Sequence, residues 1–138
     1  MSRAAHQFGA LHFLNGITRR RAVTFLVSDF MAEAYEVPLR VANRRHDVIA
    51  VHVSDPREDF LPDVGLVAVQ DAETGREALV DTSVRSVREE YARAARQRAK
   101  KRDEIFRRTG VDVISVHTDR SYVNEIYRFF RMRERRYG

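Results

Sequence analysis

The sequence predicts an α/β protein with a parallel core sheet and one added antiparallel hairpin. Three short runs rich in β-branched and apolar residues, 22–27, 48–53 and 111–116, read as strands. Longer segments with helical spacing separate them, and strands that alternate with helices favour a parallel sheet. Two further runs, 65–70 and 76–81, lie close enough in the chain to pair as a hairpin.

Length and composition favour a single soluble domain over residues 1–138. The chain has 138 residues, 43% of them hydrophobic, and no cysteine, which excludes disulfides, thiolate zinc sites and a cysteine nucleophile. The formal net charge of +5 favours an acidic partner, such as a nucleic acid or an acidic protein face. No apolar run approaches the length of a membrane span or signal peptide, so we expect a cytoplasmic protein with no membrane partner.

The stretch from Ala22 to Phe30 is the centre of the predicted fold. A helix over about 5–18, with Leu11, Leu14 and Ile17 on one face, precedes it. Its nearly continuous apolar run predicts a strand buried on both faces, which then reaches Ser28 and Asp29. These two residues lie where ligands bind in open α/β sheets, and they equally suit a cap on the next helix. Both interpretations stay open.

The next helix and strand follow the same pattern. The helix is expected to begin near Val37, with Pro38 in its first turn. The strand 48–53 ends at Ser54 and Asp55. His52 within it is expected to be an edge or lightly buried residue.

The longest helix is predicted over 84–109, opened by Thr82 and Ser83 and stopped by Gly110. Its middle is almost wholly basic and supplies the candidate nucleic-acid contacts: Arg96, Arg98, Lys100, Lys101 and Arg102. No aromatic residues are interleaved to stack on bases, so a solvated helix face is the favoured explanation.

The last strand ends at Thr118 and Asp119, and one of these two residues is expected to cap the final helix. Three predicted strands therefore end in a hydroxyl followed by a carboxylate: Ser28-Asp29, Ser54-Asp55 and Thr118-Asp119. Such oxygens suit Mg²⁺ or Ca²⁺. Asp29 is singled out because its strand is expected to be the most central. No catalytic motif accompanies it, so the chain is not expected to be an enzyme.

Four segments together resemble a known bacterial family: FLVSDF, RRHDVIAVHVSDPRE, LPDVGLVAVQDAETGREALVDT and GVDVISVHTDRSYVNEIYRFFRMR. The chain is similar to the domain of unknown function fifty-eight family, a von Willebrand factor A-like group, from about Leu11 to Arg133. The resemblance implies a Rossmann-like, three-layer fold with a metal-ion-dependent adhesion site at the carboxyl edge of the sheet.

The resemblance also implies which residues form that site. Asp29 matches the aspartate that follows the family's fourth strand, and Ser28 is its neighbour. The Asp-x-Ser-x-Ser motif of the first strand is missing from this sequence. The chain therefore looks like the C-terminal half of such a domain, with an incomplete site for Mg²⁺.

The resemblance implies a non-catalytic protein-interaction module that works with a MoxR-type AAA+ ATPase. Its contact edge would comprise Ser54, Asp55 and Asp119 beside the Ser28-Asp29 pair. Because half of the fold would be missing, we expect the unpaired edge of strand 22–28 to form a homodimer. The alternative is a nucleic-acid-binding protein that uses the basic helix and the arginine-rich C-terminus.

Overall fold

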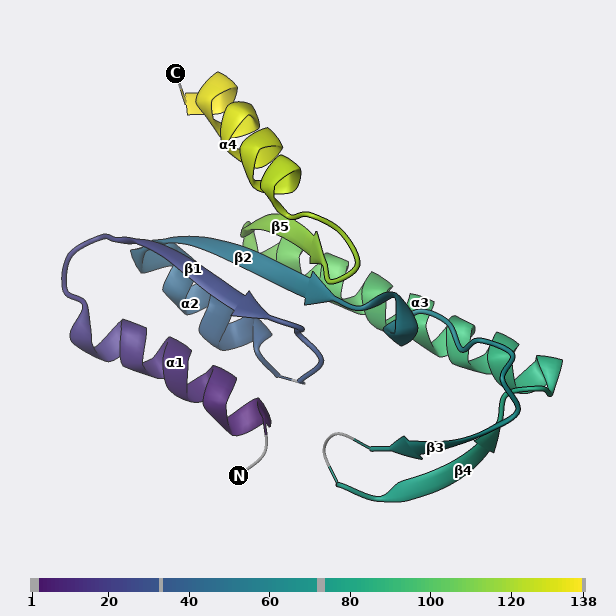
Figure 1. Cartoon of the computed structure of the whole chain (residues 1–138). Helices are drawn as coiled ribbons and strands as arrows, with labels where there is room; N and C mark the ends of the chain where they lie inside the picture. Colours follow the sequence, from purple (N-terminus) through teal and green to yellow (C-terminus); the bar gives the residue numbers. More distant parts are fainter. Residues whose placement is uncertain (1–2, 33, 72–73, 138) are drawn as a thin grey trace.

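The computed structural model describes residues 3–32, 34–71 and 74–137, and its elements follow the predicted order (Figure 1). The elements are α1 (Arg3–Ile17), β1 (Val23–Ser28), α2 (Glu36–Arg45), β2 (Asp47–Ser54), the 3-10 turn η1 (Pro56–Glu58), β3 (Leu66–Gln70), β4 (Glu77–Asp81), α3 (Arg85–Thr109), β5 (Asp112–His117) and α4 (Val123–Tyr137). The predicted α/β class, with a parallel sheet and a separate antiparallel hairpin, is confirmed. No helix in the described ranges is long and apolar enough to cross a membrane.

The core sheet has the order β1-β2-β5, and both pairs are parallel. β2 is therefore the central strand, and residues Val48, Ile49 and Ala50 within it are buried on both faces. The expectation that 22–28 would be the most central strand is wrong. β1 pairs with β2 on one side only among the strands that the structure describes.

One face of the sheet carries most of the core. The apolar faces of α1, α2 and α3 pack there against β2 and β5 in a single cluster (Figure 1). The members of this cluster from the three helices are Leu11, Leu39, Ala42, Ile105 and Phe106. This layer also covers the inward side of β1 through Leu26.

Among the described elements, α4 covers the opposite face. Phe129 packs against Ile49 and Ile114, which lie on β2 and β5. Phe130 of α4 approaches β1, with its ring centroid 6.3 Å from that of Phe25, but Val23, Phe25 and Val27 remain exposed. The prediction that the first apolar run is buried on both faces is therefore wrong, because α4 does not extend over β1.

An ion-pair cluster fixes α4 at the amino ends of β2 and β5. The Arg133 guanidinium donates to both carboxylate oxygens of Asp47, at 2.7 and 2.9 Å, and its Nε lies 3.3 Å from Asp112. Arg136 contacts the same Asp112 at 3.2 Å. The Arg133 side chain is only 15% exposed, so its charge interacts with both carboxylates with little screening by water.

Replacing Arg133 with Met should therefore destabilise the chain by about 2–4 kcal/mol, because two partly buried carboxylates lose their partner. Urea denaturation gives this free energy of unfolding. The matched control is Arg128→Met, since Arg128 is exposed on the same helix and, within the described part of the chain, forms an ion pair with the neighbouring Glu125. Equal effects of the two substitutions would contradict the role given to Arg133.

Helix ends agree with the sequence at the end of α3 and at the start of α2, which begins at Glu36 with Pro38 in its first turn. They differ at the starts of α3 and α4. Gly110 ends α3 with φ +67°, as predicted, and its N–H points to the carbonyls of Phe106 and Arg107. Neither Thr82 nor Ser83 caps α3, because Val84 holds that position without a side-chain cap. Nor does Thr118 or Asp119 cap α4, which begins at Val123.

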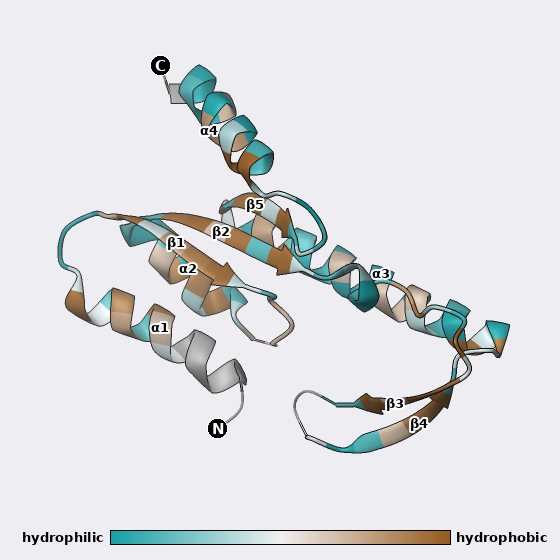
Figure 2. Cartoon of the chain, viewed as in Figure 1, coloured by the Kyte–Doolittle hydropathy of each residue, from teal (hydrophilic) through white to brown (hydrophobic). Residues whose placement is uncertain are grey.

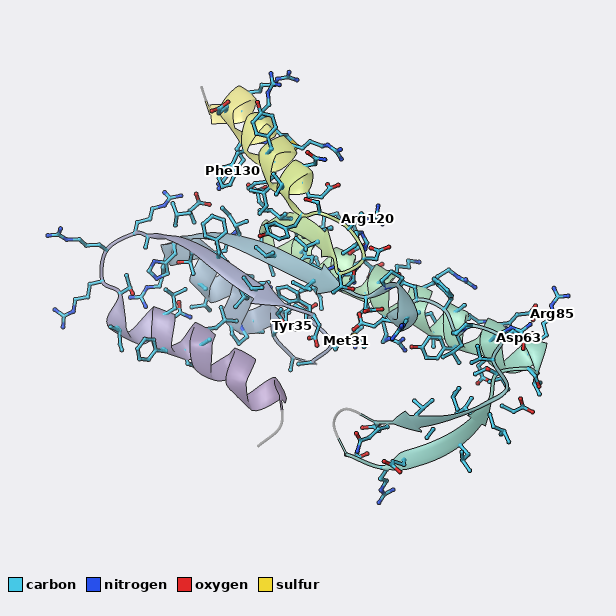
Figure 3. All side chains as sticks on the ribbon, viewed as in Figure 1. Met31, Tyr35, Asp63, Arg85, Arg120 and Phe130 are labelled. Atoms are coloured by element: carbon cyan, nitrogen blue, oxygen red, sulfur yellow. The ribbon has the colours of Figure 1, made fainter. Side chains whose placement is uncertain are left out.

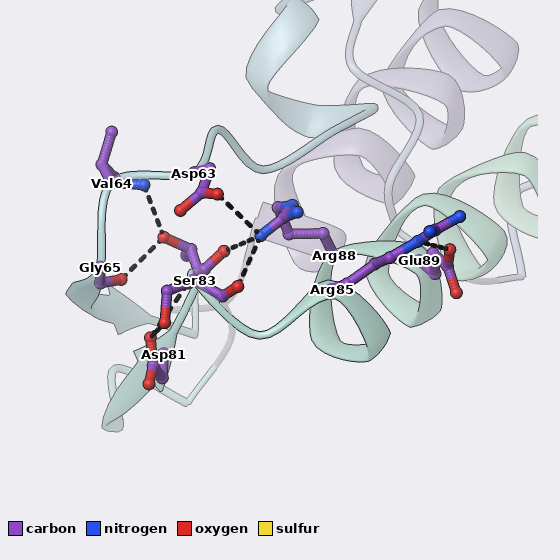
Figure 4. Close-up of polar contacts among 9 residues, drawn as sticks. Asp63, Val64, Gly65, Asp81, Ser83, Arg85, Arg88 and Glu89 are labelled. Carbon is purple, nitrogen blue, oxygen red and sulfur yellow. Dashed lines mark hydrogen bonds and ion pairs between the residues drawn. The ribbon is translucent and has the colours of Figure 1, made fainter.

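The β3–β4 hairpin stands away from the core sheet, beside the first turns of α3 (Figure 1). Buried Thr82 ties its base together, accepting from the N–H of Val64 at 3.1 Å and donating to the carbonyl of Gly65 at 2.7 Å. Arg88 then donates to the carbonyls of Thr82 and Ser83 and pairs with Asp63 (Figure 4). The hairpin is therefore anchored by polar contacts, whereas its apolar side chains, such as Leu66 and Leu79, are exposed. Figure 2 shows that much of β3 and β4 is nevertheless hydrophobic in sequence. The predicted turn residues Ala72 and Glu73 lie outside the described residues.

Candidate binding site at the carboxyl edge of the sheet

The carboxyl ends of the parallel strands share one edge, and β2 and β5 bring their polar residues into contact there. The Ser54 hydroxyl lies 3.0 Å from Nδ1 of His117. The Thr118 hydroxyl donates to Asp55 at 2.9 Å.

Asp55 also caps the 3-10 turn that follows β2. Its carboxylate accepts from the N–H of Arg57 at 2.8 Å, while its own N–H donates to Glu58. The hydrogen bond from Arg57, followed by that from Thr118, lowers the pKa of Asp55. Asp119, the third predicted edge carboxylate, is exposed and lies 3.5 Å from the Arg120 guanidinium.

Ser28 and Asp29 shape the loop that leaves β1. The N–H of Phe30 donates to Ser28 at 2.9 Å, and the N–H of Met31 donates to Asp29 at 3.2 Å. These bonds form a local turn, and because α2 begins only at Glu36, neither residue caps that helix.

The backbone of this loop is strained. Phe30 and Ala34 have φ values of +52° and +65°, which non-glycine residues rarely adopt. Phe30 is held by burial, with its ring centroid 4.9 Å from that of Phe106 and 5.4 Å from that of Tyr35. Aromatic packing therefore sets the position of the loop after β1.

The predicted Mg²⁺ ligands do not form a metal site within the described part of the chain. No group of three or more histidine, aspartate or glutamate side chains there is arranged to hold a metal ion. Asp29 and Ser28 already accept backbone N–H groups, and Mg²⁺ requires near-octahedral oxygen coordination. Ser28 and Asp29 alone therefore do not fit this ion.

We expect millimolar Mg²⁺ to leave the melting temperature of the chain unchanged, because a ligand stabilises only a state that binds it. Differential scanning fluorimetry with MgCl₂, against NaCl at equal ionic strength, measures this. A rise in melting temperature that Asp29→Asn abolishes would contradict the conclusion.

His52 is the residue that the sequence prediction undervalued. It is 7% exposed in the central strand, and its Nε2 lies 2.9 Å from a guanidinium nitrogen of Arg102. Burial, followed by the charge of Arg102, lowers the pKa of His52 to about 4. The imidazole is therefore neutral at pH 7 and accepts a hydrogen bond from Arg102.

Four polar side chains line the same face of the sheet beneath α3. In register, His52 pairs with Ser115 and Ser54 with His117, and residues two apart on a strand point to the same side. These four residues line a cavity of about 200 Å³ together with Arg98 and Arg102 of α3. The i, i+2 spacing of polar residues in both strands is the sequence signal that could have revealed this polar cavity lining.

A second cavity of about 120 Å³ lies against the loop after β1, where Figure 3 labels Met31 and Tyr35. Its lining includes Asp29 and Lys101, and it shares Met31, Arg98 and Arg102 with the first cavity. The two cavities therefore form one groove, which we call the edge groove. Three of the five predicted basic contacts line it, whereas Arg96 and Lys100 line neither cavity and are exposed.

The His52 environment makes stability depend on pH. The folded-state pKa lies below the ordinary histidine value, so the unfolded chain binds the proton first as the pH falls. Stability is therefore lost between about pH 6.5 and pH 4, by up to about 3 kcal/mol.

His52→Gln should remove this part of the pH dependence, as measured by urea unfolding across that range. His12→Gln, at an exposed position of α1, is the control and should retain it. An unchanged profile for His52→Gln would contradict the assignment.

Together, the fold and the groove define an α/β domain with a polar crevice at the carboxyl ends of its parallel strands. The family model described as "Protein of unknown function DUF58" matches residues 2–101. The chain belongs to this family, as its sequence resemblance indicated.

The relatives are uncharacterized mycobacterial proteins. One from Mycobacterium avium is 36% identical over 129 residues, which cover 91% of this chain and 75% of the relative. Proteins from Mycobacterium bovis and Mycobacterium tuberculosis are each 38% identical over 129 residues. The chain spans only 40% of the length of these two longer relatives. No solved structure matches the chain.

Proposed function

We propose that this chain is a non-catalytic protein-interaction module. The observation that carries the proposal is the uncovered apolar face of β1. Val23, Phe25 and Val27 point to the side that α4 leaves open, and they are 60%, 48% and 63% exposed. Phe130 of α4 borders them and is itself 43% exposed (Figure 3). Contiguous exposed apolar side chains of this kind mark protein contact surfaces.

The backbone of β1 supports the same proposal. No described strand pairs with its outer edge, and its sequence, VTFLVS, has none of the lysines or prolines that protect edge strands. Another chain can therefore add to the sheet and cover the apolar face in one step. We infer that a second copy of the chain does so, giving a homodimer.

Val27→Lys should make the chain monomeric, because a charge would be buried in the contact. Val37→Lys is the matched control, since Val37 has a similar exposed fraction, 59%, but lies on α2. Sedimentation equilibrium at high micromolar concentration measures the mass. A monomeric unmodified chain, or equal loss of the dimer in both variants, would contradict the homodimer.

For the second partner, we propose a MoxR-type AAA+ ATPase, as the family resemblance implies. Its contact would be the carboxyl edge, where Asp29, Asp55 and Asp119 supply negative charge. Although the three carboxylates do not form one cluster, all lie at the ends of adjacent strands. The proposal concerns a protein contact and requires no metal.

Affinity capture from the native lysate, with nuclease added, tests this partner by mass spectrometry. We expect an AAA+ ATPase to be retained by the unmodified chain and lost with Asp29→Ala. Glu134→Ala, at an exposed position of α4, should retain it. Retention by Asp29→Ala would show that the contact lies elsewhere.

A nucleic-acid-binding function is the second candidate, favoured by the exposed Arg96 and Lys100 on α3. It ranks lower because Arg98, Lys101 and Arg102 line the edge groove and interrupt the basic stripe. It requires binding that weakens steeply with salt, since phosphate contacts release counterions. Absence of binding to duplex or single strands at about 50 mM salt would dismiss it.

A further inference from the structure

Three cations of α3 meet where the two cavities of the edge groove join. Arg98, Lys101 and Arg102 follow the i, i+3, i+4 spacing, which places them on one face of the helix. Arg98 and Arg102 line both cavities, and Lys101 lines the one beside β1. The basic residues that sequence analysis assigned to a solvated face thus include three at a concave site.

Arg102 is held in place before any ligand binds. One terminal nitrogen contacts Nε2 of His52 at 2.9 Å, while Nε and the other terminal nitrogen donate to Asp103 at 3.1 and 3.0 Å. Its side chain is 22% exposed, so the guanidinium is partly withdrawn from water. A cation fixed in this way loses little conformational entropy on binding an anion.

Arg98 has a different setting. It is exposed, and its guanidinium carbon lies 6.0 Å from the centre of the Tyr91 ring on the same helix. Arg88, Arg102 and Arg133 each form an ion pair. Arg98 forms none with the described residues. Its charge is therefore available to a ligand in the groove.

The lining of the edge groove also includes acidic side chains. Glu58 and Asp59 line the first cavity with Arg98 and Arg102, and together with Arg98 they act on the pKa of Tyr91. Asp29 lines the second cavity with Arg98, Lys101 and Arg102.

Hydroxyl groups complete the site. Ser54 and Ser115 line the first cavity, and the hydroxyl of Ser54 is oriented by His117. Guanidinium and hydroxyl groups together donate to the oxygens of carboxylate and phosphate groups.

We propose that the junction of the edge groove, formed by Arg98, Lys101 and Arg102, binds an oxyanion group of the carboxylate or phosphate class. Arg102 provides the fixed charge, and Arg98 closes on the bound group. The proposal does not depend on the β1 interface or on the ATPase partner.

Nuclear magnetic resonance titration of the full chain tests the site. Inorganic phosphate and a hexaglutamate peptide are the two probes, each compared with chloride at equal ionic strength. We expect saturable shifts confined to the groove, including the amide signals of Ser115 and Met31. Tighter binding of the peptide would identify a protein carboxylate as the source, and tighter binding of phosphate would identify a phosphate compound.

Matched variants on one helix decide the outcome. Arg98→Gln should weaken binding about tenfold, as expected for loss of a charged hydrogen bond, whereas Arg96→Gln should change it by less than about twofold. Lys101→Gln against Lys100→Gln provides a second pair if Arg98→Gln fails to fold. Equal weakening within a pair, or shifts that do not saturate, would overturn the proposal, because they indicate diffuse charge attraction.

Discussion

A strand of a parallel sheet needs a layer of side chains on each face, and β1 has such a layer on only one. The three helices α1, α2 and α3 cover its inward side, while α4 approaches its outer side through Phe130, which lies near Phe25. The apolar residues Val23, Phe25 and Val27 are left facing water. Burying them would stabilise an assembly by several kcal/mol at roughly 25 cal/mol per Å². This exposed surface is the basis for proposing an interaction module.

The position of α4 determines how much of the sheet stays open. Arg133 binds Asp47 and Asp112 at the amino ends of β2 and β5, which holds the helix over those strands. Phe129 packs beneath it against both. The same helix therefore completes the core over β2 and β5 and leaves β1 largely uncovered. At the other end of the sheet, α3 carries Arg98, Lys101 and Arg102 to the carboxyl edge, so the two proposed binding surfaces are held by separate elements.

Sequence patterns predicted the positions of the helices and strands well. They predicted less well which faces of these elements are buried and which residues their polar side chains contact. The runs 48–53 and 111–116 became strands because their apolar residues meet helices on both sides. The run 22–27 has the composition of a strand buried on both faces. Whether a helix covers each face depends on how distant elements pack, which periodicity does not reveal. The roles of Thr82, Thr118 and His52 were missed for a common reason. Each bonds a residue at least 17 positions away, so local spacing carried no sign of the contact.

Amide hydrogen exchange at β1 tests the central claim most directly. In the isolated chain, the N–H groups of β1 that point away from β2 lack a strand partner and should exchange rapidly. If this edge is the interface, those amides should become protected as the chain concentration rises from low to high micromolar, while the amides of the central strand β2 stay protected throughout. Exchange at β1 that does not change with concentration, or with a bound partner, would contradict the account.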